Sequence, residues 1–167
     1  MRGMGLNPRG HALAAVRGTF YRAVDPEFRS AALAGSRSAG RYSRPDEPTL
    51  YLSSSVDGVE AAMTAHRADR SSGLEIVEVI VEATRILDLR DPAARVAVGV
   101  DLADAVAPWQ DVVASGGTPR SWDVRDRLVA AGADGLIDPS RRRPGLWHLV
   151  LFRWNDGDAP RVRVVPA

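Results

Sequence analysis

The chain has 167 residues, a length that fits one domain able to bury its own hydrophobic core. It contains no cysteine, which excludes a disulfide framework, a thiolate zinc site and a cysteine nucleophile. The formal net charge is +1, no apolar run approaches the ~20 residues of a membrane span, and residues 1–16 lack the apolar segment of a signal peptide, so we expect a soluble cytoplasmic protein.

The first residues carry little periodic pattern. Residues 1–17 are rich in Gly, Arg and Ala, and we interpret them as a flexible leader before one folded domain at 18–167. Aromatic and branched residues after Gly18 predict a strand, which Asp25 and the proline after it should end. The small, polar residues 29–40 are typical of a loop.

A short strand followed by a helix is predicted next. Thr49–Ser53 has the apolar content of a buried strand. Asp57 is placed like a helix N-cap, and Glu60 follows it at the spacing of a capping box. We expect this helix to continue to about Arg67.

The middle of the chain predicts further strands and a short helix. Leu74–Val81 alternates with period two, which places Val77, Val79 and Val81 on one face of a strand. Arg85–Leu89 is a second, shorter strand candidate. A stretch of small residues after Asp91 predicts a short helix that ends near Trp109.

The last third predicts one helix and three strands. Thr118 and the proline after it begin the helix, Trp122, Leu128 and Val129 share its apolar face, and Gly132 ends it. The strands are expected at Gly135–Ile137, Leu146–Trp154 and Arg161–Val165. Many strands with segregated helices indicate a single α+β domain whose mixed sheet is largely antiparallel.

Six side chains at strand ends, in turns or near a helix start are candidates for chemistry: Arg22, Arg41, Tyr51, Glu60, His66 and Ser140. Each also has a structural interpretation. The arginines suit surface ion pairs, Tyr51 suits a core position, and the capping box accounts for Glu60. His66 lies six residues after Glu60, about 240° around a helix, so the two are poor candidates for one acid–base pair.

Several short motifs occur in order along the chain: Tyr21-Arg22-Ala23, Gly40-Arg41-Tyr42, the strand from Pro48 to Ser55, and Gly135 to Ser140 followed by Leu149 to Phe152. In order and spacing they resemble the RES-domain family, the toxin half of bacterial Xre-RES toxin–antitoxin pairs. The resemblance covers roughly Gly18 to Trp154. It implies an ADP-ribosyltransferase-like core.

The resemblance also implies a function, which is to bind NAD as a substrate, without a metal, and to break its bond between nicotinamide and ribose. A carboxylate stabilises the positive charge that builds on the ribose, and guanidinium groups suit the pyrophosphate. Water, phosphate and a protein all remain open as acceptors, so the activity is that of an NAD glycohydrolase, an NAD phosphorylase or an ADP-ribosyltransferase. The implied catalytic residues are Glu60 and Arg41, and the implied NAD-binding residues are Arg22, Arg41, Tyr51, Ser140 and His66.

The partner implied by the resemblance is an Xre-type antitoxin with a helix-turn-helix part, whose C-terminal segment blocks the NAD site. The antitoxin would contact DNA, so no direct nucleic-acid binding by this chain is expected. An RNA or DNA surface made by the arginines is a less favoured interpretation, because acids are nearly as numerous and no aromatic residue is interleaved with Arg141–Arg143.

One departure from the family pattern leaves an alternative open. The pattern places a glutamate one helical turn before a histidine, but Ala62 stands one turn before His66, and Glu60 is the only acid nearby. The alternative is a catalytically impaired RES-fold module that binds NAD, an antitoxin, or both.

Overall fold

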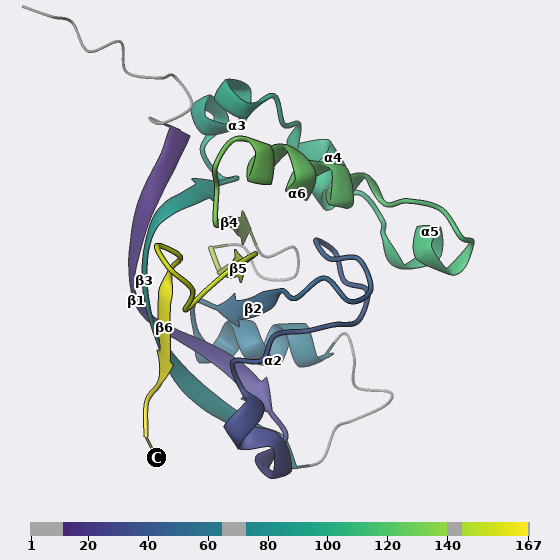
Figure 1. Ribbon diagram of the computed structural model, residues 1–167. Coiled ribbons are helices and arrows are strands. Elements are labelled where there is room, and N and C mark those ends of the chain that lie inside the picture. Colours follow the sequence, from purple (N-terminus) through teal and green to yellow (C-terminus); the bar gives the residue numbers. More distant parts are fainter. Residues whose placement is uncertain (1–11, 65–72, 140–144, 167) are drawn as a thin grey trace, which may run out of the picture.

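The computed structural model describes residues 12–64, 73–139 and 145–166, and for residues 61–64 it gives the backbone only. Strands and short helices combine in an α+β fold, which confirms the predicted class (Figure 1). The elements in chain order are β1 (Leu13–Val24), the 3-10 helix η1 (Pro26–Ala31), β2 (Leu50–Ser53), α2 (Val56–Thr64), β3 (Glu75–Asp88), α3 (Pro92–Val98), α4 (Leu102–Val106), α5 (Gln110–Ala114), α6 (Arg120–Ala130), β4 (Gly135–Pro139), β5 (Trp147–Leu151) and β6 (Arg161–Val164).

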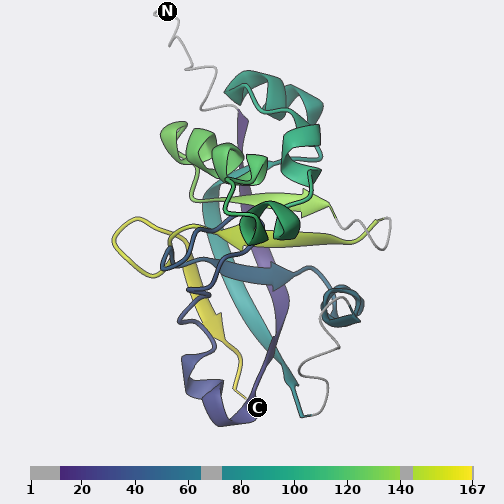
Figure 2. The same ribbon diagram turned by 90° about the vertical axis from the view of Figure 1, so that its right-hand side faces the viewer.

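The strand pairs close into a ring. Antiparallel pairs join β3 to β1, β1 to β2, β2 to β5 and β5 to β4, and a parallel pair between β4 and β3 completes the circuit. β6 pairs with β3 in antiparallel orientation outside this circuit. Figure 2 shows the long β1 and β3 running through the molecule, with β4, β5 and β2 stacked across them. The mixed, largely antiparallel sheet predicted from the sequence is thereby confirmed.

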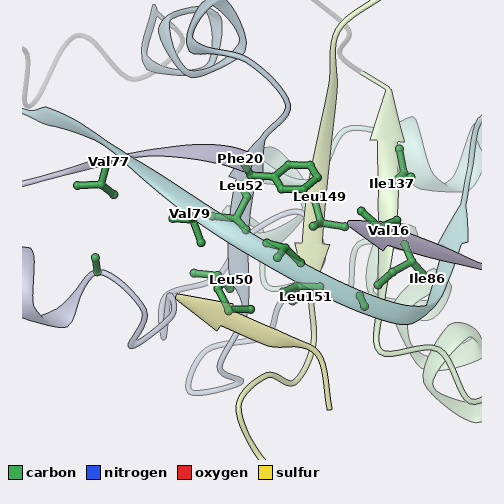
Figure 3. Close-up of a cluster of buried hydrophobic side chains, with 14 of the residues drawn as sticks. Val16, Phe20, Leu50, Leu52, Val77, Val79, Ile86, Ile137, Leu149 and Leu151 are labelled. Atoms are coloured by element: carbon green, nitrogen blue, oxygen red, sulfur yellow. The ribbon is translucent and has the colours of Figure 1, made fainter. Parts of the chain in front are cut away.

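One hydrophobic core lies on the inner face of this ring, where alternate residues of each strand meet (Figure 3). Leu52, Val79 and Leu149 are buried almost completely. Phe20 packs edge-on against Trp147, with the ring centroids 5.5 Å apart. Each fully buried aliphatic or aromatic side chain of this kind stabilises the fold by about 1.5–3 kcal/mol.

A second core lies on the opposite face of β4 and β5. Leu136 and Val150 point there, and the helices α3, α4 and α6 cover them, with Leu128 of α6 fully buried. Figure 1 shows these helices gathered over one end of the sheet. The face of the sheet that carries Val150 also includes Tyr51 of β2. The candidate site lies on β2 and at the beginning of β5.

The first strand starts earlier than predicted. β1 begins at Leu13 and Val16 is already buried in the ring core, so the folded part does not begin at Gly18. Residues 1–11 of the expected leader lie outside the described residues.

The strand predicted at Leu74–Val81 continues through Arg85–Leu89 as one element, β3. Its inward-facing valines at 77, 79 and 81 are buried as predicted, but the alternation changes phase after Ala83, since Ile86 and Leu87 are both buried. The register with β1 shifts at this point, because Val16 pairs with Ala83 but Ala14 pairs with Ile86, so β3 has one residue more than β1 in this interval. Ala83 and Ile86 both belong to the ring core, and the extra residue between them made one strand resemble two.

The helical region differs from the prediction in detail. The stretch after Asp91 forms two helices, α3 and α4, because Gly99 ends α3 in a left-handed conformation with a φ of 70°. α5 was not predicted. In α6, Trp122 and Leu128 are buried as expected, but Val129 is 51 % exposed and the prediction for it was wrong. No helix in the described part of the chain is long and apolar enough to cross a membrane.

Candidate functional site

Tyr51 in β2 holds a tight turn formed by residues 40–43. Its hydroxyl accepts a hydrogen bond from the backbone N–H of Tyr42 at 3.1 Å and shares a second, at 2.8 Å, with Ser43 Oγ. Gly40 is required here, since a Cβ at that position would lie 2.7 Å from the Tyr51 hydroxyl oxygen. Burial raises the pKa of the Tyr51 hydroxyl, so it remains protonated and available as a hydrogen-bonding group at neutral pH.

Helix α6 holds the same turn from the opposite side. Three of its side chains, all near its N-terminal half, bind three successive main-chain carbonyl groups of the turn. These hydrogen bonds hold the backbone of the turn, which includes Arg41, in one conformation. Trp122 Nε1 donates to the carbonyl of Gly40 at 2.8 Å, Ser121 Oγ donates to that of Arg41, and Arg125 Nη1 donates to that of Tyr42 at 2.9 Å.

The Arg41 side chain reaches the C-terminal end of α4. Its Nη1 donates to the carbonyl oxygens of Ala105 at 3.1 Å and Ala107 at 2.8 Å. The last carbonyls of a helix lack partners within the helix, so a guanidinium is a favourable cap there. Both the backbone and the side chain of Arg41 are therefore positioned by helices of the layer above the sheet.

Arg22, near the end of β1, lies beside β2 and has few partners. Its Nη1 donates to the carbonyl of Tyr51 over a long distance of 3.4 Å, and its Nε is buried with no hydrogen-bond partner. No ion pair joins Arg22 to a carboxylate among the described residues. Burial lowers the pKa of the guanidinium, although an arginine side chain remains charged. Among the described residues Arg22 is thus a poorly compensated, partly buried cation, and such burial of a charge costs stability.

Glu60 lies on helix α2, whose start differs from the prediction. The hydroxyl of Ser55 accepts from the backbone N–H of Gly58 at 3.0 Å, so Ser55 caps the helix and Asp57 falls inside its first turn. The predicted capping box is wrong, and it no longer accounts for Glu60. Glu60 is exposed on the helix surface.

A serine–histidine contact at the junction of β2 and α2 was missed by the sequence analysis. Ser53 Oγ and His148 Nδ1 lie 3.0 Å apart, and the backbones of Ser54 and Trp147 bond at 3.0 Å. These residues are nearly a hundred positions apart, so only the register between β2 and β5 brings them together. The alternation of His148 with the buried Leu149 was the available signal that His148 faces away from the ring core.

Arg22 contacts the main-chain carbonyl of Tyr51, and the turn that carries Arg41 contacts the Tyr51 hydroxyl. Glu60 lies on the helix that follows β2. The roles predicted for these four residues stay predictions. His66 and Ser140 lie outside the described residues. Within the described ranges, no group of three or more His, Asp or Glu side chains is arranged to hold a metal ion.

Two of three comparisons with known proteins found a match. The model of the RES domain matches residues 19–167. A solved structure of the M. tuberculosis MbcT-MbcA toxin-antitoxin complex contains a chain of similar fold, with a TM-score of 0.56 and 21 % sequence identity, over 97 % of this chain and 91 % of that one. No curated protein matches. The shared fold is ADP-ribosyltransferase-like, as the resemblance to the RES-domain family implied. Because the family model spans nearly the whole folded part, the chain belongs to the RES-domain family.

Proposed function

We propose that this protein is an intracellular toxin that consumes NAD by breaking the bond between nicotinamide and ribose. The observation that carries the proposal is Arg22, a partly buried cation whose Nε has no partner and which forms no ion pair among the described residues. A buried, uncompensated charge lowers stability unless a ligand neutralises it. The pyrophosphate of NAD has the charge and the geometry to do so.

The proposed chemistry follows from the residues around β2. Arg22 and Arg41 bind the pyrophosphate, and Tyr51 packs beside the nicotinamide. Departure of nicotinamide leaves positive charge on the ribose, and the Glu60 carboxylate stabilises that charge electrostatically. Ser140 and His66 remain predicted NAD contacts outside the described residues.

The proposed partner is an antitoxin. The similar chain of known structure comes from a complex of a toxin with its antitoxin, which supports a protein inhibitor for this chain as well. We expect an Xre-type protein whose helix-turn-helix part binds DNA and whose C-terminal segment covers the site beside β2. The net charge of +1 gives this chain no overall field to attract nucleic acid by itself.

The test is NAD loss on addition of the purified protein, followed by chromatography of the products with and without phosphate. Glu60→Gln removes the carboxylate charge and should lower the rate by about 10² to 10³. Asp57→Asn makes the same change one turn earlier on α2 and should leave the rate unchanged. ADP-ribose as product indicates water as the acceptor, and ADP-ribose 1-phosphate indicates phosphate. Full activity of Glu60→Gln would remove Glu60 from the mechanism.

The second candidate is an RES-fold module that binds NAD without consuming it. It is favoured by one observation, that position 62 is alanine where the family pattern has its glutamate, while Glu60 is exposed on α2. A calorimetric titration separates the two candidates. Binding of NAD with no product after prolonged incubation supports the module, and turnover excludes it.

A further inference from the structure

A row of polar side chains crosses the sheet on the face that carries Tyr51. The registers pair Asp138 of β4 with His148 of β5, His148 with Ser53 of β2, and Ser53 with Tyr21 of β1. Directly opposed residues share a face, with Cβ atoms about 4.5–5.5 Å apart. The next row on this face contains Tyr51, opposite Val150. The polar row therefore runs between Tyr51 and the start of α2.

The burial of this row is uneven. Ser53 is 6 % exposed and Asp138 is 5 % exposed, whereas the His148 side chain between them is only partly buried. The 3.0 Å contact between Ser53 Oγ and His148 Nδ1 fixes one nitrogen of the ring. A histidine held in this way has its second nitrogen, Nε2, oriented by the bond at Nδ1. The His148 imidazole thus lies opposite the buried carboxylate of Asp138. A histidine beside a carboxylate is a common proton acceptor in enzymes.

We propose that His148 is a catalytic residue of the site, which accepts the proton of the acceptor hydroxyl as that oxygen attacks the ribose. Nδ1–H donates to Ser53 Oγ, and Nε2 takes the proton. The neighbouring carboxylate of Asp138 stabilises the imidazolium that results, because an opposite charge nearby favours the charged form. This inference rests on the proposed function, since it names a residue for that reaction.

The step balances with water as the acceptor. The bond from ribose C1′ to the nicotinamide nitrogen breaks, and nicotinamide leaves with the bonding electron pair. A bond from water oxygen to C1′ forms, and the proton of that water passes to His148 and then to solvent. An anionic acceptor such as azide brings no proton, so its attack on C1′ requires no proton acceptor.

This difference between acceptors gives the test. Wild type, His148→Gln and Glu60→Gln are each assayed for nicotinamide release in phosphate-free buffer, with water alone and with added sodium azide, and ADP-ribosyl azide is measured by mass spectrometry. We expect His148→Gln to lose on the order of 10² or more of its rate with water and to keep most of its rate with azide. Glu60→Gln should lose rate with both acceptors, because charge on the ribose develops in either reaction.

The other outcomes overturn the inference. An equal loss with water and azide in His148→Gln assigns His148 a structural or binding role, and an unchanged rate with water excludes it from the reaction. If wild type releases no nicotinamide with either acceptor, the proposed function fails and the inference fails with it. Azide turnover by His148→Gln also shows that the variant is folded. Ser53→Ala, which removes only the positioning hydroxyl, should give a smaller loss with water and none with azide.

Discussion

Replacing Arg22 with methionine is expected to stabilise the free protein while removing its response to NAD. Methionine is shorter than arginine but keeps an unbranched, apolar stem, and it removes the buried Nε donor that has no partner. A buried, unsatisfied polar group costs about 1–3 kcal/mol. Within the described part of the chain, the only side-chain hydrogen bond lost is the long one to the Tyr51 carbonyl, at 3.4 Å, whose contribution is at the low end for such bonds.

The net gain should be about 1 kcal/mol in the free energy of unfolding, because the relief of the unsatisfied donor exceeds the loss of this long bond. For a domain of this size that gain raises Tm by about 2–4 °C. NAD at a hundred times its Kd adds about 2.7 kcal/mol to wild type and little to the variant. The order of the two melting temperatures should therefore reverse when NAD is added.

The assay is thermal unfolding followed by circular dichroism, with and without NAD. Arg17→Met is the matched control, because Arg17 lies in the same strand and is exposed, with a 3.3 Å surface ion pair to Glu82. It should change stability by no more than about 0.5 kcal/mol and should keep the NAD response. A lower Tm for ligand-free Arg22→Met, together with an intact shift on adding NAD, would refute the reasoning that Arg22 is an uncompensated cation at an anion site.

Two further substitutions test the framework of the site by urea unfolding. Tyr51→Phe leaves the N–H of Tyr42 and the buried hydroxyl of Ser43 without their shared partner, and should cost about 1–3 kcal/mol. Burial raises the folded-state pKa of Tyr51 above its ordinary value of 10.0, so the stability that the protonated hydroxyl contributes is fully present below that value and is lost as pH rises through the folded pKa. The phenylalanine variant should therefore lose less stability than wild type on alkaline titration, and an identical alkaline loss in both proteins would contradict this. Ser55→Ala removes the cap of α2 and should cost about 1 kcal/mol, whereas Asp57→Ala should cost only a few tenths; the reverse order would mean that the helix begins at Asp57 after all.

The strands of the sheet could be predicted from the sequence because each strand buries one face and therefore has a recognisable apolar pattern. The alternating valines of β3 and the apolar run of β5 predicted two of its strands, and both are present. The register shift after Ala83 could not be predicted, since periodicity alone does not distinguish one strand with an extra residue from two short strands.

Polar contacts between distant segments explain what the sequence did not reveal. The buried face of α6 includes Arg125, which donates to the Tyr42 carbonyl and to Thr49 Oγ1, whereas the apolar pattern of the helix indicated Val129. The contact of Ser53 with His148 likewise joins residues that are distant in the sequence. Both depend on strand register and on helix placement, which a single sequence does not encode locally.

Helix α6 is part of the site although none of the proposed ligand-binding residues lies on it. Its side chains bind the carbonyls of residues 40, 41 and 42 in succession, so the turn cannot move without breaking several hydrogen bonds together. The turn in turn contacts the Tyr51 hydroxyl, and Arg41 reaches from it to α4. A ligand that binds Arg41 therefore meets a guanidinium that is already ordered, and less conformational entropy is lost on binding. Replacing Arg125 with an apolar residue should therefore keep α6 packed on the sheet and still weaken ligand binding at Arg41, because the turn that carries Arg41 loses a hydrogen bond.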